Sequence, residues 1–290
     1  MAERIPEIDR LYDAVLRYRE TDEFKQLMNF VADFKHVGPY NAMLVHIQKP
    51  GSTYVASAAD WKQKYGRTVK PGARPLLILK PFGPVSFVFE YKDTEGAPLP
   101  DALVRPFKND APITQFQMNQ LIVGAGYDGI AVVRQQYGTN YAGHIQFAET
   151  ASKLCFSGTK SQLFIKSNYT IVLNENMPIS EQFTTMLHEL GHFYCGHINV
   201  NDMTWLPRRI YLNENEEEFE AETVCWLVCK RLGIENNSVP YLDQYLEKNE
   251  YIPSVSIDSI LKAAGIIESC LTGSKTPRKE LIIKDEKLNQ

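Results

Sequence analysis

Residues 188–192 read His-Glu-Leu-Gly-His, and this stretch constrains the fold and chemistry of the 290-residue chain more than any other. Two histidines four positions apart lie on one face of a helix, so their imidazoles can bind a single metal ion. The helix expected around them has Pro178 before it and Gly196 near its end, and its apolar residues recur at spacings of three and four. The motif therefore predicts a metal site on a rigid, packed helix.

The acidic run at residues 213–222, Asn-Glu-Asn-Glu-Glu-Glu-Phe-Glu-Ala-Glu, is a candidate for the remaining ligand. Asparagine caps and early acidic residues favour a helix that ends at Gly233. A catalytic zinc site uses three protein ligands and keeps one position open. We expect Glu218 to be the third ligand and Glu222, one turn later, to orient a ligand imidazole, with Glu222 as the alternative ligand. Without the upstream motif, the run would be interpreted as a solvated helix start.

The chemistry expected at this site is hydrolysis. Glu189 stands beside a ligand on the same helix and is the predicted general base towards water. The residue that stabilises the oxyanion stays open between Tyr194 and Tyr211. His197 follows the second motif histidine by five residues, whereas the metzincin pattern requires six, so we interpret it as structural.

The same segments resemble a known family. Residues 169–174 followed by 182–192, and then residues 217–222, are similar to the strand and the two metal-binding helices of the ImmA/IrrE-type metallopeptidases. The resemblance covers roughly residues 116–235. It implies a zincin-like fold with a mixed sheet, a single Zn²⁺ and neutral metalloendopeptidase activity. It also implies that the strand at residues 169–174 is an edge on which an extended peptide substrate lies.

The upstream half has a second resemblance, to the N-terminal domain of ArdC-like antirestriction proteins. The matching segments are Tyr40–Val45, Gln48–Pro50, Trp61, Gly66–Gly72, Pro81 and Phe89–Gly96. This resemblance implies a small domain that binds single-stranded DNA and is joined, in this order, to a metallopeptidase domain.

The residues themselves give partial support for DNA binding. Between residues 61 and 89 the chain has six Lys or Arg and no Asp or Glu, interleaved with aromatic residues, a composition that suits an unpaired strand. The predicted contacts are Trp61, Lys62, Lys64, Arg67 and Lys70. The competing interpretation is that the aromatic residues are the core of short strands and the lysines are solvated. Residues 1–110 have 16 Lys and Arg against 14 Asp and Glu, so any DNA contact is local.

Composition sets wider limits. A chain of 290 residues that is 44% hydrophobic can bury the cores of two domains. It has no run of 18 apolar residues and no signal-peptide pattern at its start, so we expect a cytoplasmic protein without a membrane partner. Its five cysteines do not form a disulfide framework.

The fold class expected from these patterns is α+β. We place an ArdC-like N-terminal domain at residues 1–115, a zincin-like domain at 116–272 and a charged, loosely held tail at 273–290. Predicted helices cover residues 11–18, 21–31, 115–123, 239–247 and 257–271, and a mainly β region spans 53–107. Predicted strands of the second domain are 129–133, 143–147, 162–165 and 170–173.

Three classes of function are compatible with the sequence. The first is a zinc endopeptidase that cleaves a specific protein substrate linked to DNA, stress or mobile-element regulation. The second is a single-stranded DNA-binding antirestriction-type protein whose zincin half is mainly a scaffold. The third is an interaction module with structural zinc. The presence of Glu189 favours the first, because a structural site needs no base.

Overall fold

The computed structural model describes residues 18, 20–80, 83–100, 103, 112–138, 140–157, 162–198, 205, 206, 208, 209, 211–234 and 239–283. These residues form two compact units. The N-terminal unit is the described part of 1–109 together with 230–233 and 243–254. The C-terminal unit is the described part of 110–229, 234–242 and 255–290. The expected helix at 11–18 lies, apart from residue 18, outside the described residues.

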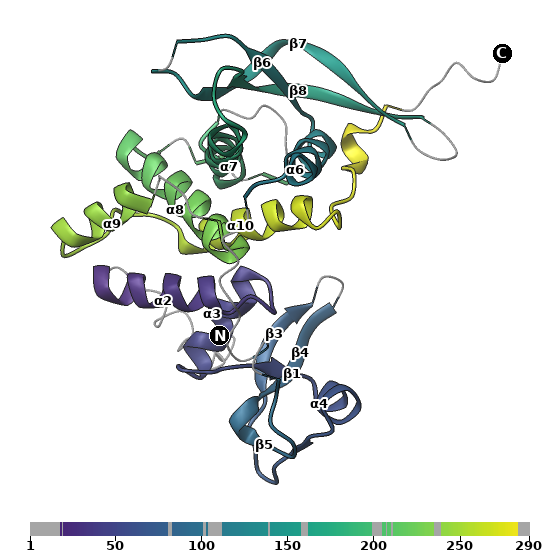
Figure 1. Cartoon of the computed structure of the whole chain (residues 1–290), viewed down its shortest axis with the longest axis vertical. Helices are drawn as coiled ribbons and strands as arrows, with labels where there is room; N and C mark the ends of the chain where they lie inside the picture. Colours follow the sequence, from purple (N-terminus) through teal and green to yellow (C-terminus); the bar gives the residue numbers. More distant parts are fainter. Residues whose placement is uncertain are drawn as a thin grey trace, which may run out of the picture. The chain divides into compact units, whose positions relative to one another are not determined.

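The N-terminal unit combines helices with short antiparallel strands (Figure 1). Its elements are α2 (Thr21–Asp33), α3 (Pro39–Gln48), β1 (Val55–Ala56), α4 (Ala58–Tyr65), β2 (Thr68–Val69), β3 (Leu76–Lys80), β4 (Gly83–Glu90), η1 (Tyr91–Asp93) and β5 (Thr94–Glu95). One sheet has the order β1-β4-β3, and β2 pairs with β5. The mainly β region predicted for residues 53–107 thus also contains a helix, α4, which Ser57 caps through its side chain.

The C-terminal unit places helices against a three-stranded sheet (Figure 1). Its elements are α6 (Gln115–Tyr127), β6 (Ile130–Gln135), β7 (Gly143–Ser157), β8 (Gln162–Asn174), α7 (Ile179–Cys195), α8 (Glu214–Leu232), α9 (Val239–Lys248), α10 (Ile257–Leu271) and η2 (Lys279–Leu281). The last residues of α8 and most of α9 are grouped with the N-terminal unit. Helices α6 and α7 pack on the sheet, and α10 packs on both. The α+β class is therefore confirmed.

The order of this sheet corrects one expectation. The two strands predicted at 162–165 and 170–173 are parts of one long strand, β8, which lies between β6 and β7. Strand β8 pairs in parallel with β6 and antiparallel with β7, with Ile145 opposite Ile171. Residues 169–174 are buried in the middle of the sheet and not at an edge, so they cannot add a peptide strand. The sheet edges in the described residues are β6 and β7.

Helix α7 is fixed by its apolar face and by its ends. Phe183, Met186, Leu187, Leu190 and Phe193 are fully buried along one stripe. The helix starts after Pro178 without a side-chain cap, and it stops at Gly196, which adopts a left-handed conformation (φ 82°). A stop at this point lets the chain turn while the motif residues stay inside the helix.

Helices α7 and α8 approach each other closely at a glycine. A Cβ atom at Gly191 would lie 3.0 Å from Ala221 Cα and 3.1 Å from Ala221 O. Carbon atoms prefer separations of about 3.5–4.0 Å, so no other residue fits here without moving a helix. The glycine of the motif therefore sets the distance between the two helices that bear the predicted ligands.

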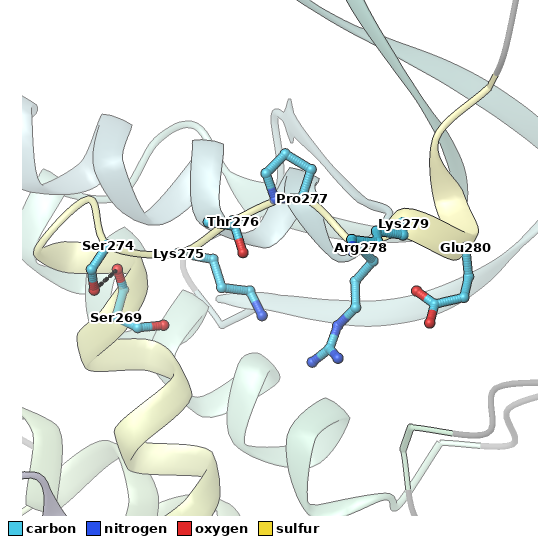
Figure 2. Close-up of a pocket in the computed structure, with 8 residues that line it drawn as sticks. All are labelled: Ser269, Ser274, Lys275, Thr276, Pro277, Arg278, Lys279 and Glu280. Atoms are coloured by element: carbon cyan, nitrogen blue, oxygen red, sulfur yellow. Dashed lines mark hydrogen bonds between the residues drawn. The ribbon is translucent and has the colours of Figure 1, made fainter. Parts of the chain in front are cut away.

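The segment after α10 differs from the loosely held tail that the sequence suggested. Residues 274–280 belong to the C-terminal unit and, with Ser269, line a pocket (Figure 2). Lys275 Nζ lies 2.7 Å from Asp128 Oδ2, and Arg278 Nε lies 2.8 Å from Asp128 Oδ1. Tyr194 donates a hydrogen bond to the same fully buried carboxylate. Further along, Ile283 N–H donates to Phe164 O, so the segment is anchored as far as residue 283, and residues 284–290 lie outside the described part.

The remaining helix predictions agree well with the structure. Helix α10 has the predicted bounds, α9 extends one residue further, and α6 continues four residues beyond the predicted end at 123. Among the described residues, no helix is both long and apolar enough to span a membrane.

Candidate metal centre

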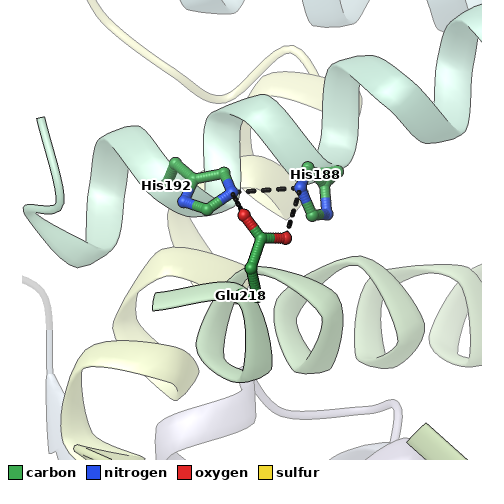
Figure 3. A group of neighbouring side chains, drawn as sticks. All are labelled: His188, His192 and Glu218. Atoms are coloured by element: carbon green, nitrogen blue, oxygen red, sulfur yellow. Dashed lines mark hydrogen bonds and ion pairs between the residues drawn. The ribbon is translucent and has the colours of Figure 1, made fainter. Parts of the chain in front are cut away.

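Three nitrogen and oxygen donors converge where α7 faces α8 (Figure 3). His188 Nε2 and His192 Nε2 lie 3.0 Å apart. The Glu218 carboxylate lies between the two rings, with one oxygen 3.4 Å from His188 Nε2 and the other 3.4 Å from His192 Nε2. The helical spacing of the histidines and the close approach at Gly191 together bring these three side chains to one point.

The spacing of the donors fits a tetrahedral metal ion. Ligand distances of about 2.0–2.1 Å around zinc place neighbouring donors about 3.3 Å apart. The three observed separations, 3.0, 3.4 and 3.4 Å, are close to that value. The three side chains are between 13% and 43% exposed, so solvent reaches the group. The residues therefore fit a divalent metal with three protein ligands.

The electrostatics of the group favour a positive charge. The adjoining imidazoles of His188 and His192 hold the pKa of Glu218 far below its ordinary value. Burial would lower the pKa of His188, but Glu218, Glu222 and Glu189 raise it to about 10. In the metal-free protein a proton supplies the charge that the carboxylates attract. A bound divalent cation would take the place of that proton.

Glu189 is held by the sheet and does not join the three ligands. Its side chain is nearly buried, and its Oε2 accepts a hydrogen bond of 2.9 Å from the N–H of Ile145 in β7. The carboxylate thus stands between the metal-binding helix and an edge strand. This position suits a group that exchanges a proton with a water molecule or a substrate beside the metal.

Glu222 lies on the far side of His188. Its Oε1 is 3.4 Å from His188 Nδ1, and its buried Oε2 has no hydrogen-bond partner within the described part of the chain. The structure brings Glu218, and not Glu222, to the side of the imidazoles where the two Nε2 atoms meet. Glu222 contacts the opposite ring nitrogen, which is the position from which a carboxylate can orient a ligand imidazole.

The two tyrosines considered for oxyanion stabilisation occupy different surroundings. Tyr194 is buried and donates its hydroxyl hydrogen bond to Asp128, so it is not directed to the metal centre. Tyr211 has 75% of its surface exposed. The described structure therefore assigns neither hydroxyl to the metal centre.

A second group of polar side chains contacts the Nδ1 side of His192, and no sequence motif indicates it. His192 Nδ1 is 3.0 Å from His197 Nδ1, and His197 Nε2 is 2.9 Å from Glu220 Oε2. The fully buried Glu220 also accepts hydrogen bonds from Arg209 and from the N–H of Ser256. Burial would raise the pKa of Glu220, but these three donors lower it.

This second group is not a second metal site. Cys195, His197 and Glu220 have donor atoms close enough to surround an ion. However, the Arg209 guanidinium contacts both oxygens of Glu220, with Nη2 2.8 Å from Oε1. A cation already neutralises the only charged ligand, so an additional metal ion would be repelled.

The predicted DNA contacts divide into buried and exposed residues. Trp61 is fully buried in a cluster with Tyr54 and Leu99, and its Nε1 donates to Phe89 O. Arg67 is buried, donates to Thr94 and lies over a tyrosine ring. These two residues hold the fold together and cannot stack on or reach a strand of DNA.

The other three predicted DNA contacts are at the surface. Lys62, Lys64 and Lys70 are exposed; Lys64 pairs with Asp60, and Lys70 donates to Lys92 O. The competing interpretation, that the aromatic residues form a core, is correct for Trp61. It does not decide whether the lysines bind DNA.

A family comparison agrees with the first sequence resemblance, to metallopeptidases. Residues 128–225 match the family model of the IrrE N-terminal-like domain, a peptidase family. An uncharacterised protein of Bacillus anthracis is 21% identical over 281 residues, a match that covers 83% of this chain and 46% of the relative. The chain thus spans about half the length of the curated relative that it matches.

Two similar crystal structures are of the antirestriction ArdC protein from the R388 plasmid, one metal-free and one Mn(II)-bound. Their identities to this chain are 14% and 16%, and their TM-scores are 0.35 and 0.33. The matches cover 84% and 82% of this chain and 87% and 83% of theirs. Over residues 128–225, which contain both histidines and Glu218, this chain is similar to the IrrE N-terminal-like peptidase family, as its sequence indicated.

Proposed function

We propose that this protein is a zinc-dependent endopeptidase with a zincin-like catalytic domain, which hydrolyses a peptide bond in a protein substrate. The observation that carries the proposal is the triangle of donor atoms from His188, His192 and Glu218, with the carboxylate of Glu189 close enough to help raise the pKa of His188. The match to a peptidase family over the same residues supports it. Three ligands with an open position are the arrangement of catalytic zinc sites, whereas structural sites are closed by four.

The side chains have distinct roles in the proposed reaction. When bound, zinc polarises a carbonyl group and lowers the pKa of water from 15.7 to about 7. Glu189 accepts the proton of the attacking water and returns it to the leaving amine. The hydrogen bond from Ile145 N–H to Oε2 fixes this carboxylate, and we assign the proton transfer to Oε1. Glu222 holds the imidazole of His188 in place.

The substrate is expected to lie along β7 and not along β8. Strand β7 pairs with β8 on one side and has no second strand partner among the described residues. An edge strand can pair with an extended peptide. Because Ile145 of this strand contacts Glu189, a peptide along the first part of β7 would pass the proposed catalytic base.

The test compares protein cleavage in cells that express the wild type, Glu189→Gln or Glu181→Gln. The last variant is a matched control, because Glu181 is exposed on the first turn of the same helix. We expect new protein N-termini with the wild type and with Glu181→Gln but not with Glu189→Gln, while all three proteins retain zinc. Equal cleavage by the Glu189→Gln protein would contradict the assignment of the base.

A second candidate function is binding of single-stranded DNA by the N-terminal unit, with the zincin domain mainly as a scaffold. The observation that favours it is the combination of the exposed Lys62, Lys64 and Lys70 with the ring of Phe87, which is 57% exposed on β4. Surface cations and accessible rings are the contacts that unpaired strands use. In this candidate function Trp61 and Arg67 stabilise the fold and do not contact DNA.

The test measures binding of the full chain to a fluorescent oligothymidine at increasing salt. Affinity should fall with a log-log slope of about −0.7 per contacted phosphate. Changing Lys62, Lys64 and Lys70 to Glu should abolish binding and leave the zinc content unchanged. Lys262→Glu, on the exposed surface of α10, serves as a control for charge reversal in general. Wild-type protein that does not bind at low salt would exclude this function.

A further inference from the structure

We propose that His197, Glu220 and Arg209 form a hydrogen-bonded chain that fixes the tautomer and the ring orientation of His192, so that its Nε2 lone pair is presented to the metal. This inference rests on the proposed metal site. It gives a positioning role to three residues that lie outside the ligand set.

The chain is continuous from the ligand into the protein interior. His192 Nδ1 lies 3.0 Å from His197 Nδ1, and His197 Nε2 lies 2.9 Å from Glu220 Oε2. Arg209 contacts both oxygens of Glu220, and the N–H of Ser256 donates to Oε1. The side chains of His197 and Glu220 are 2% and 0% exposed, so water does not compete for these contacts.

The chemistry of the groups sets the direction of every hydrogen bond. An ionised carboxylate only accepts, and the Arg209 guanidinium only donates. The hydrogen of His197 must therefore be on Nε2, which faces Glu220. A neutral imidazole with a hydrogen on Nε2 has an acceptor at Nδ1. His192 then donates from its own Nδ1, and its Nε2 has a lone pair.

The lone pair on His192 Nε2 is directed towards the other two predicted metal ligands. His192 Nε2 is the atom that lies 3.0 Å from His188 Nε2 and 3.4 Å from Glu218 Oε1. A metal ligand needs a deprotonated nitrogen at that position, and a partner on the other ring nitrogen raises its basicity. The hydrogen of His192 is thus fixed by a carboxylate two hydrogen bonds away.

The two ligand histidines are held in different ways. His188 has the carboxylate of Glu222 near Nδ1, at 3.4 Å and on the same helix as Glu218. His192 has a second histidine at the usual hydrogen-bond distance, with a buried ion pair behind it. The backbone reinforces this contact, because Gly196 ends α7 and His197 N–H donates to His192 O. The last turn of α7 therefore brings residue 197 back onto residue 192.

The experiment uses the full-length protein and measures the zinc dissociation constant by competition with a chromogenic chelator. His197→Phe keeps a ring but removes both hydrogen bonds. His197→Gln keeps an acceptor for His192 and a donor for Glu220. We expect Phe to weaken zinc binding about 10- to 100-fold and Gln to restore affinity to within about threefold of the wild type. The unfolding midpoint of the metal-free proteins is measured in parallel.

The outcomes separate a positioning role from a structural one. If His197→Phe lowers the metal-free unfolding midpoint but leaves the zinc dissociation constant unchanged, His197 is only structural and the inference is wrong. If Phe and Gln weaken zinc binding equally, the hydrogen bonds are not the cause and the inference is again wrong. Wild-type protein that does not bind zinc would overturn both this inference and the proposed function, whereas the first two results overturn the inference alone.

A measurement on the wild type keeps the inference testable if the Phe variant does not fold. Nitrogen-15 chemical shifts of the zinc-loaded protein distinguish the two tautomers of each histidine. We expect the hydrogen on Nδ1 in His192 and on Nε2 in His197. A hydrogen on Nδ1 of His197 would reverse the direction of the chain and refute it.

Discussion

Gly191→Ala should weaken metal binding, because it forces apart the two helices that hold the ligands. The added Cβ would lie 3.0 Å from Ala221 Cα, whereas carbon atoms prefer about 3.5 Å or more. Helices α7 and α8 would have to separate by about 0.5 Å. The nearest atoms belong to the backbone of Ala221, so a side-chain rotation cannot relieve the contact.

The consequence for the metal centre follows from the distances. The oxygens of Glu218 lie 3.4 Å from His188 Nε2 and His192 Nε2, and the separation would increase both distances to about 3.9 Å. Zinc sites keep their ligand distances within about 0.2 Å. We expect zinc affinity to fall about tenfold or more, equivalent to about 1.4 kcal/mol. Overpacking should cost about 1–3 kcal/mol of stability, less about 1 kcal/mol because alanine favours a helix over glycine.

The assay is chelator competition for zinc, with thermal unfolding of the metal-free protein alongside. Ser180→Ala is a control, because Ser180 is exposed in the first turn of the same helix. Adding Ala221→Gly to Gly191→Ala should not restore affinity, since the backbone of residue 221 remains in place. A Gly191→Ala protein that binds zinc like the wild type would refute the argument that this glycine sets the geometry of the site.

Two further predictions concern stability. Asp128→Asn should lower the free energy of unfolding by about 3 kcal/mol in urea titrations, because it leaves the buried Lys275 ammonium unpaired. Asp258→Asn, at an exposed ion pair, is the control and should cost under about 0.5 kcal/mol. Equal losses would contradict the role of Asp128. His36 accepts a hydrogen bond from Val55 N–H, and burial together with a nearby arginine lowers its pKa to about 4 from 6.5. Below pH 6.5 the unfolded chain therefore binds a proton that the folded chain excludes. The contribution of His36 to the stability of the N-terminal unit should be complete above pH 6.5 and fall by about 1 kcal/mol towards pH 4, a figure reduced for screening by solvent. A His36→Gln protein with the same pH profile would contradict this.

Patterns that repeat along one helix could be interpreted from the sequence. The four-residue spacing of His188 and His192 placed both imidazoles on one side of α7, and the apolar stripe of that helix was predicted correctly. The choice between Glu218 and Glu222 was open, because both lie on the same stripe of α8. Only the close approach of the two helices determines which carboxylate faces the imidazoles.

Relations between distant segments could not be predicted in the same way. An apolar run indicates a strand but not its neighbours, so the central position of β8 was missed. The charged residues after α10 looked solvated, yet Lys275 and Arg278 pair with Asp128, 150 residues upstream in the case of Arg278. A segment with a tryptophan among lysines has the same composition whether the ring stacks on DNA or packs in a core. Trp61 packs in a core.

The role of His197 was hidden for a related reason. Known histidine motifs are recognised by the spacing of direct ligands, and His197 stands one residue short of the metzincin spacing. A residue that hydrogen-bonds the ring nitrogen of a ligand histidine opposite the metal has no fixed sequence spacing from that ligand. Its partners, Glu220 and Arg209, come from α8 and from the segment before it, and only the folded chain brings them together.

The measurement that tests the central claim most directly is the anomalous difference map of zinc-loaded crystals, recorded at the zinc absorption edge. The proposed function predicts one peak per chain, about 2.0–2.2 Å from His188 Nε2, His192 Nε2 and a carboxylate oxygen of Glu218. A peak coordinated by Glu222 in place of Glu218 would contradict the assigned ligand set. The absence of any peak between α7 and α8 in zinc-soaked crystals would contradict the metal centre itself.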